Sequence, residues 1–448
     1  MNLFLNFFSE DATIDNFCEE FGKILQHVSP ENCEKICVAV SGGSDSVALL
    51  ILGQIVLQRY PEVKIFCVTV DHNLRAEALE EALFVKNLCD RLGVPHEILT
   101  WEHHSENFDH ENVGKLENLA REARYRLISE FCAKNNIKLM LTGHTWNDQL
   151  ETSEMRGIMG SGAVGLAGMS QIRSFSKNLK ILRPLLHFSR DHLRNFLKNR
   201  GISWKNDPMN EMEEFLRVSL RLKIRNYNED QLKNASQKII DCGAKRHETE
   251  RIAVNILKSA EFSSIGYASI AIDQLTTPAP EVRCEVLKRL IWNVGGKKYA
   301  PSISPLMLEQ IFQKKINTIG RCLLKFKRNR LFIFREVRNV MRISRDSVTS
   351  EEILKFDDRF ELKFHKNLTN ISVGPPQNFS LIKKFYEKNF PEVQQNAIRT
   401  LPCVYQNNKM IATLAPIGMI DLENNSYRIS ELFSCDFTPK PELFDVFL

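Results

Sequence analysis

The sequence lacks several features that would assign it to a specialised class. Its apolar runs stay well short of the roughly 18 residues that a membrane span needs. The apolar start Met1–Phe8 has neither a basic residue nor a small-residue cleavage site, so we expect no signal peptide. Eleven cysteines are scattered without a Cys-x-x-Cys pair or a Cys/His cluster of zinc-site spacing. We therefore expect a globular, cytoplasmic protein that has no membrane partner, no disulfide framework and no structural zinc ion.

Charge is distributed unevenly along the chain. The formal net charge of +5 divides into −11 for residues 1–170, +18 for residues 171–350 and −2 for residues 351–448. Lysines and arginines that neutralise phosphates release counterions, so the basic middle segment indicates a polyanion partner. A solvated basic surface is equally compatible with charge alone.

The first 200 residues alternate short apolar runs with longer amphipathic ones. The short runs are rich in Val, Ile and Leu without strict alternation, as in buried parallel strands: Lys35–Val40, Ile65–Val70, His96–Trp101, Ile137–Thr142 and Leu179–Leu186. Helical periodicity follows each of them, at Ser46–Arg59, Ala76–Leu92, Glu111–Asn135, Trp146–Ile158 and Arg190–Arg200. The alternation predicts an α/β domain with a doubly wound parallel sheet, whose ligands gather at the carboxyl ends of the strands.

The pattern changes near Phe215. Two basic alternating runs, Arg321–Lys327 and Arg330–Arg335, predict a hairpin that turns at Arg328-Asn329. The polar stretch Arg342–Ser350 predicts a linker. Helical periodicity dominates before the hairpin, at His247–Ser259, Glu281–Trp292 and Pro305–Lys315, and short apolar runs follow the linker. We expect three domains: a catalytic α/β domain at residues 1–214, a basic, mainly helical domain at 215–345, and a small α+β domain at 351–448.

The strongest local signal is the loop Ser41-Gly42-Gly43-Ser44-Asp45-Ser46, which joins a predicted strand to a predicted helix. Gly42 and Gly43 let backbone N–H groups approach a phosphate because no Cβ intervenes. The following helix adds its dipole and its first amides, and the three serines can donate hydroxyl hydrogen bonds. Asp45 offers a carboxylate to the Mg²⁺ that accompanies a triphosphate. The spacing is not that of a Walker loop, so it predicts a phosphate site of another type.

A second polar cluster follows the predicted strand Ile137–Thr142. His144, Asp148 and Glu151 are spaced i, i+4 and i+7, so on a helix they would share one face. At the carboxyl end of a strand, that face would look towards the phosphate loop. Two carboxylates and an imidazole can hold Mg²⁺, position a cationic amine and move a proton. An ordinary polar helix face is the alternative.

Residues 41–46 resemble the pyrophosphate-binding loop, or PP-loop, of the ATP pyrophosphatases. Within that group, Gly143–Thr152 and the glycine-rich stretch Gly160–Met169 resemble the tRNA(Ile)-lysidine synthetases. Four more motifs match that family in order and spacing: Val70–Arg75, Ala120–Tyr125, Arg183–Leu186 and Trp204–Pro208. The resemblance covers nearly all of the chain. It is looser after residue 214, where the basic helical middle and the segment Asp358–Leu362 resemble the family's two C-terminal domains. The segment Phe215–Arg221 departs from the family's Arg-Asn-Arg-Ile-Arg pattern, which leaves the roles of Arg217 and Arg221 open.

The resemblance implies an enzyme that uses ATP and Mg²⁺ to join free L-lysine to the wobble cytidine of an isoleucine tRNA with a CAU anticodon. It makes Asp45, His144, Asp148 and Glu151 the catalytic candidates, with Asp45 as the Mg²⁺ ligand. It adds Asp71 and His72 to Ser41–Ser46 as ATP-binding residues. It leaves a homodimer open as the oligomeric state. Candidates for a phosphate clamp are Arg121, Arg124 and Arg183, and candidates for tRNA binding are Lys325, Lys327, Arg328 and Arg330.

Three other functions compete with this interpretation. A tRNA sulfur-transferase of the same group would usually need paired cysteines, which this sequence lacks. A ligase for a free metabolite would leave the basic middle segment unexplained. A non-catalytic RNA-binding relative would have lost the loop or the carboxylates, yet Asp45, His144, Asp148 and Glu151 are all present.

Overall fold

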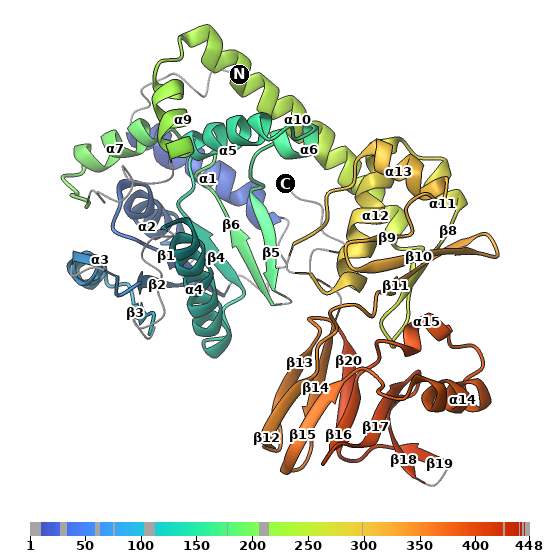
Figure 1. Ribbon diagram of the computed structural model, residues 1–448. Helices are drawn as coiled ribbons and strands as arrows, with labels where there is room; N and C mark the ends of the chain where they lie inside the picture. Colours follow the sequence, from blue (N-terminus) through green and yellow to red (C-terminus); the bar gives the residue numbers. More distant parts are fainter. Residues whose placement is uncertain are drawn as a thin grey trace. The chain divides into compact units, whose positions relative to one another are not determined.

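A six-stranded sheet forms the centre of the first half of the chain (Figure 1). The computed structural model describes residues 10–26, 34–58, 63–74, 77–102, 113–176, 178–205, 215–297, 299–423, 426–438, 440 and 443. It divides into two units, one ending at His247 and the other beginning at Glu248, within helix α10 (Glu229–Leu257). In the described ranges every helix is too short or too polar to cross a membrane.

The sheet of the first unit has the strand order β3-β2-β1-β4-β6-β5. The first five strands in this order are parallel, and β5 pairs antiparallel with β6 at the edge. The strands are β1 (Lys35–Ala39), β2 (Lys64–Asp71), β3 (His96–Thr100), β4 (Leu139–Thr142), β5 (Ile172–Ser176) and β6 (Leu179–Leu182). Because β1 lies between β2 and β4, the loops after these three strands converge at one edge of the sheet.

Helices cover both faces of this sheet, as the doubly wound prediction requires. One face packs against α1 (Glu10–Gln26), α2 (Ser44–Leu57), α3 (Glu77–Leu92) and α7 (Arg190–Asn199). The other packs against α4 (Val113–Lys134), through Ile128, Phe131 and Cys132. Strand β1 serves both cores, because Ile36 and Val38 point to the first face while Cys37 and Ala39 point to the second.

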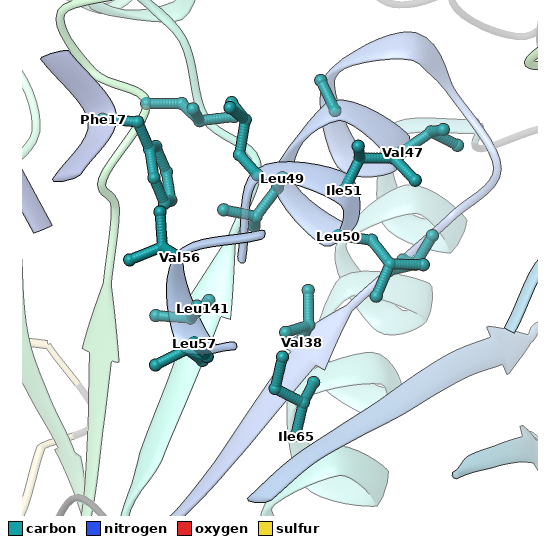
Figure 2. Close-up of a cluster of buried hydrophobic side chains, with 14 of the residues drawn as sticks. Phe17, Val38, Val47, Leu49, Leu50, Ile51, Val56, Leu57, Ile65 and Leu141 are labelled. Carbon is teal, nitrogen blue, oxygen red and sulfur yellow. The ribbon is translucent and has the colours of Figure 1, made fainter. Parts of the chain in front are cut away.

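Helix α2 is buried on every side. Its residues Val47–Leu52 all belong to the first core, so it has no polar face and cannot be stable without partners. Figure 2 shows its side chains between Phe17 of α1 and the strand residues Val38, Ile65 and Leu141. This packing fixes the helix that begins at the phosphate loop.

Three shorter elements and one long helix complete the first unit. Trp146 and Leu150 of α5 pack on Ile224 of α9 and Ile239 of α10. This small core joins α9 and α10 to α5. The bounds are α5 (Trp146–Ile158), α6 (Ala163–Leu166) and α9 (Phe215–Arg225).

The second unit begins with a helical core around a five-stranded antiparallel sheet of order β7-β8-β11-β10-β9. The predicted hairpin is confirmed: β10 pairs with β11, and Arg328 and Asn329 have φ of 48° and 56° at the turn. The elements are β7 (Glu261–Phe262), β8 (Ala268–Ala271), α11 (Asp273–Thr276), α12 (Pro280–Gly295), α13 (Pro305–Phe312), β9 (Thr318–Ile319), β10 (Cys322–Lys327) and β11 (Arg330–Arg335).

The rest of the second unit combines helices with two antiparallel sheets, in agreement with the α+β prediction, and the sheets have the order β12-β15-β16-β17-β18-β19 and β13-β14-β20. The strands are β12 (Ile343–Val348), β13 (Ile353–Phe356), β14 (Phe360–Phe364), β15 (Leu368–Gly374), β16 (Cys403–Gln406), β17 (Lys409–Ala415), β18 (Gly418–Glu423), β19 (Ser426–Ile429) and β20 (Phe433–Phe437). Helices α14 (Phe379–Asn389) and α15 (Gln395–Ile398) lie between β15 and β16 in the chain.

The linker prediction for Arg342–Ser350 was wrong. Most of this stretch is β12, which pairs with β15 from Ile343 to Val348. As an edge strand of its sheet it exposes Ser344–Ser347, and the resulting polar composition resembles that of a linker. The division into three domains stays a prediction.

Candidate active site

The Ser41–Ser46 loop turns sharply between β1 and α2. Gly42 has a φ of +91°, which side chains other than glycine rarely adopt. Ser46 closes the turn, because its Oγ accepts a hydrogen bond from the Ser41 amide at 3.2 Å and donates one to the Gly43 carbonyl at 3.0 Å. The carbonyl of Gly42 accepts from the amide of Lys205 at 2.9 Å. The loop is therefore held from both sides at the first turn of α2, where helix amides attract anions.

The end of β4 lies directly against this loop. A Cβ added to Gly143 would lie 3.0 Å from the Ser46 nitrogen and 3.1 Å from the carbonyl carbon and oxygen of Asp45. Only glycine allows that approach without a shift of backbone. Gly143 thus brings the segment from His144 to Glu151 next to the phosphate loop, as the sequence predicted from its place after a strand.

His144 does not lie on the helix that carries Asp148 and Glu151. Helix α5 begins at Trp146 with Thr145 as its N-cap residue, and Asp148 Oδ2 accepts from the Thr145 amide at 2.7 Å and hydroxyl at 2.9 Å. The expected shared face therefore holds only the two carboxylates, because the capping box starts the helix after His144. His144 lies in the preceding loop, with Nδ1 2.9 Å from Thr142 Oγ1.

The pKa of His144 is far from that of a free imidazole. Burial, with Arg183 as the next cause, lowers the pKa of His144 to about 4, although Asp148 opposes the shift. The imidazole is therefore neutral at pH 7. A neutral ring offers one N–H donor and one acceptor, and the bond to Thr142 occupies Nδ1.

Arg190 joins the phosphate loop to α5. Its Nε donates to Asp45 Oδ2 at 2.9 Å and its Nη2 to Asp148 Oδ1 at 3.3 Å. Burial lowers the pKa of Arg190, but the two carboxylates outweigh it and raise the pKa well above its usual range. Burial raises the pKa of Asp45, and Arg190 opposes that shift. One guanidinium therefore partly neutralises both carboxylates.

Sequence reasoning missed Arg190. A signal was available: it is the first residue of α7, after the N-cap Ser189. A cation at that position opposes the helix dipole and needs an explanation. Arg194, one turn further along, also points to the loop, with its Nε 3.4 Å from Ser44 Oγ.

Glu151 has a separate arginine partner. Arg221 of α9 donates from Nε to Glu151 Oε1 at 2.9 Å, and both side chains are largely buried. Burial raises the pKa of Glu151, against the effect of Arg221. The departure of Phe215–Arg221 from the family pattern left the role of Arg221 open. The structure shows that Arg221 pairs with Glu151, a catalytic candidate, and offsets its charge. The side chain of Arg217 is not among those described.

Asp71 and His72 lie at the carboxyl end of β2, beside the loop that follows β1. Asp71 Oδ1 accepts from the Asn73 amide at 2.8 Å. Arg124 donates from Nη2 to His72 Nε2 at 3.0 Å, and the imidazole packs edge-on against Trp101. Burial, followed by the charge of Arg124, lowers the pKa of His72 to about 4. Both residues of this ATP-binding prediction therefore lie at the same edge of the sheet as the phosphate loop, and Arg124 contacts His72.

The other two clamp candidates differ from Arg124. Arg121 stacks over the Tyr125 ring, 5.2 Å from its centroid. Arg183 is buried and donates from Nη1 to the Ser170 carbonyl at 2.7 Å, and burial lowers its pKa to about 10. All three contribute positive charge to the surroundings of His144. Direct phosphate contact by any of them stays a prediction.

The four predicted tRNA-binding residues lie on the β10–β11 hairpin of the second unit. Lys325, Lys327 and Arg328 are exposed. Arg330 is half-buried, and its Nη2 lies 2.9 Å from Ser269 Oγ and 3.0 Å from Glu261 Oε2. Three of the four are therefore open to solvent, whereas the charge of Arg330 is already paired.

Asp45 is the best-placed Mg²⁺ ligand, but it fits only an ion that arrives with a phosphate. Among the residues that the structure describes, no three His, Cys, Asp or Glu side chains are arranged to hold a metal ion. Mg²⁺ in nucleotide sites usually binds one or two carboxylates together with phosphate oxygens and water. A carboxylate in the first turn after a phosphate loop meets that requirement.

Comparison with known proteins agrees with this geometry. Residues 16–227 match the family model described as PP-loop domain. The tRNA(Ile)-lysidine synthase of Rickettsia bellii (strain RML369-C) is 29% identical over 422 residues, 91% of this chain and 94% of that protein. That of Orientia tsutsugamushi (strain Boryong) is 27% identical over 424 residues, 89% and 92% of the two chains.

Among solved structures, the U34-tRNA thiolase of Methanococcus maripaludis, with its 4Fe-4S cluster, is 14% identical at a TM-score of 0.44, over 52% of this chain and 79% of that one. The strand order with its loop after β1 and the matches along nearly the whole sequence lead to one assignment. Residues 16–227 form a PP-loop domain, and nearly the whole chain is similar to the tRNA(Ile)-lysidine synthases.

Proposed function

We infer that this chain catalyses the ATP-dependent ligation of free lysine to the wobble cytidine of the CAU anticodon of an isoleucine tRNA, which gives lysidine, AMP and pyrophosphate. The observation that carries the inference is the approach of Gly143 to Asp45 and Ser46. It joins a phosphate loop to a pair of carboxylates in a chain that matches lysidine synthases over 94% of their length. The reaction takes place in the cytoplasm, where tRNA is modified.

In the first step the cytidine oxygen at ring position 2 attacks the α-phosphorus of ATP. The bond from that phosphorus to the bridging oxygen breaks, and pyrophosphate leaves. The Ser41–Ser46 loop and the first amides of α2 hold the departing phosphates. Asp45 would hold Mg²⁺, which would supply positive charge to offset the charge of the departing phosphates. Neutral His144, whose Nδ1 lies 2.9 Å from Thr142 Oγ1, can offer its Nε2 as a donor to the phosphate oxygens in the Nε2–H tautomer.

In the second step the side-chain amine of lysine attacks carbon 2, the carbon–oxygen bond breaks, and AMP leaves with that oxygen. The amine must lose a proton to react. Glu151 is the better acceptor, because burial raises its pKa whereas the pKa of His144 is lowered. Asp148 holds the ammonium before transfer. Covalent activation by AMP turns a poor leaving group into a good one, which splits one hard step into two.

The exposed cations of the hairpin suit contact with tRNA. Lys325, Lys327 and Arg328 project from a tight turn and can reach backbone phosphates without losing existing ion pairs. We assign them to tRNA binding and leave Arg330 to its contacts with Glu261 and Ser269. The division of labour follows the predicted three domains, with chemistry in residues 1–214.

The direct test supplies the protein with ATP, Mg²⁺ and labelled lysine. Two transcripts are compared, the isoleucine and methionine tRNAs that both carry a CAU anticodon. Label should enter the isoleucine transcript alone. Label in neither transcript, with pyrophosphate still released, would place the chain among other PP-loop enzymes.

Variants of the three predicted catalytic side chains separate the steps. We expect His144→Ala, Asp148→Asn and Glu151→Gln each to lower lysidine formation by roughly 10²–10⁴, as for loss of a positioned charge or proton acceptor. Glu151→Gln should let adenylated tRNA accumulate, because its role begins with lysine. Near-normal turnover of all three would remove these residues from the site.

A further inference from the structure

The first turn of α7 places a cation between two parts of the proposed site. Arg190 contacts Asp45, on the phosphate loop, and Asp148, on the helix that would receive lysine. Its side chain is 24% exposed, and those of Asp45 and Asp148 are 17% and 22% exposed. The ion pairs are therefore accessible to small solutes and to exchange, unlike a fully buried charge cluster.

The backbone of Arg190 is fixed although its side chain is not enclosed. Its amide donates to Asn147 Oδ1 at 2.8 Å, which ties it to the first turn of α5. Leu193, Phe196 and Leu197 of the same helix are buried, and α7 packs on α2. The guanidinium can therefore change partners by rotation of its own side chain, while its origin stays at the phosphate loop.

Arg194 strengthens the case that α7 faces phosphate. Residues four apart lie on one side of a helix, and Arg194 points to Ser44 in the same loop. Two guanidiniums next to a phosphate loop are suited to the bidentate recognition of phosphate oxygens. The sequence assigned the clamp to Arg121, Arg124 and Arg183, none of which has a described contact with Ser41–Ser46.

The same carboxylates have competing uses. Asp45 is the proposed Mg²⁺ ligand and Asp148 the proposed partner of the lysine ammonium, yet each now accepts from Arg190. An incoming cation must displace the guanidinium, and the displaced guanidinium needs another anion. The ATP phosphates would supply one within reach of α7.

We propose that Arg190 couples ATP binding to lysine binding, a proposal that rests on the proposed function. Without nucleotide, Arg190 neutralises Asp45 and Asp148 and keeps lysine affinity low. When ATP binds, the guanidinium moves to the phosphates and frees Asp45 for Mg²⁺ and Asp148 for the ammonium of lysine. Arg190 is thus a positioning residue that favours the binding of ATP before lysine.

Linkage gives this proposal a measurable form. If ATP raises the affinity for lysine by some factor, lysine raises the affinity for ATP by the same factor. We expect a factor of about 10 or more, within the roughly 5–150-fold typical of coupled sites. Removal of Arg190 leaves Asp148 without its cation, so lysine should then bind equally well with and without nucleotide.

The test is calorimetric titration of the full chain with L-lysine, with and without saturating Mg²⁺ and the ATP analogue with a methylene bridge between the α and β phosphates. Wild type should bind lysine at least about tenfold more tightly with the analogue. Arg190→Ala should bring this ratio close to 1, and Arg190→Lys should restore part of it. Arg194→Ala should weaken the analogue but keep the ratio, because its described contact is with a hydroxyl.

Lys198→Ala is the matched control, since Lys198 is exposed in the last turn of the same helix, and it should behave as wild type. A wild-type ratio near 1 would overturn the proposal, and this result needs no variant to fold. An Arg190→Ala protein that keeps the wild-type ratio would overturn it too. If wild type makes lysidine but shows no coupling, the proposed function stands and only this inference fails.

Discussion

Gly143→Ala should lower catalytic activity because the new Cβ would overlap its neighbours by a few tenths of an ångström. The new Cβ would lie 3.0 Å from the Ser46 nitrogen and 3.1 Å from the carbonyl of Asp45, whereas ordinary contacts begin at 3.4 Å. These neighbours are backbone atoms at the start of α2, a helix buried on every side. They cannot rotate away, so the loop or the end of β4 must move.

Such overpacking usually costs about 1–3 kcal/mol of stability. Because a misplacement of about 1 Å can cost 10²-fold in rate, we expect pyrophosphate release to fall roughly 10–100-fold. Steady-state assays with isoleucine tRNA measure the rate, and urea unfolding measures the stability. The matched control is Gly53→Ala in α2, where a new Cβ meets nothing within 4 Å; it should keep activity and gain up to about 1 kcal/mol. A Gly143→Ala protein with wild-type turnover would refute the claim that this approach sets the site.

Three further predictions follow from the charges. Arg221→Ala should lower lysidine formation about as much as Glu151→Gln, because the two side chains act as a pair. The double variant should form lysidine no more slowly than either single variant, and additive losses would contradict this. Folding lowers the pKa of His144 from its usual 6.5 to about 4, so as pH falls the unfolded chain binds the extra proton first and stability is lost between pH 6.5 and 4. In urea unfolding, His144→Gln should therefore lose about 1–2 kcal/mol less stability than wild type between pH 7 and pH 5. Equal losses in the two proteins would refute the shift. Replacing Lys325, Lys327 and Arg328 with alanine should reduce the slope of log affinity for tRNA against log salt concentration by about 0.7–0.9 per lost phosphate contact. Arg330→Ala should change this slope less, because the charge of Arg330 is paired with Glu261. An unchanged slope in the triple variant would exclude phosphate contact by the hairpin.

The parts of the fold that were predictable are those with local signals. Strand β1, the Ser41–Ser46 loop and α2 follow from an apolar run, two glycines and a second apolar run. Strand β5 was missed because Ile172–Ser176 is a polar, antiparallel edge strand that, within the described part of the chain, pairs with β6 alone. Strand β12 was mistaken for a linker for a similar reason. Edge strands pair on one side, so their composition says little about the sheet.

The site divides in the same way. Asp45, Asp148 and Glu151 carry their signal in short-range spacing, and the structure places them around one loop and one helix. Arg190 is 145 residues from Asp45, and Arg221 is 70 residues from Glu151, so no local pattern could pair them. The lowered pKa of His144 depends on burial and on Arg183, and neither is visible in the spacing of His144, Asp148 and Glu151.

The apolar run Val47–Leu52 of α2 also has a consequence for synthesis of the chain. The helix leaves the ribosome early, but β4, which completes the sheet beneath it, ends at Thr142, and α7, which packs on it, ends at Asn199. Until then a nascent chain would expose the apolar side chains of Val47–Leu52. The phosphate loop can therefore take its final form only after about 200 residues have emerged. Shorter translation products would leave this helix partly uncovered and would lack the complete phosphate site.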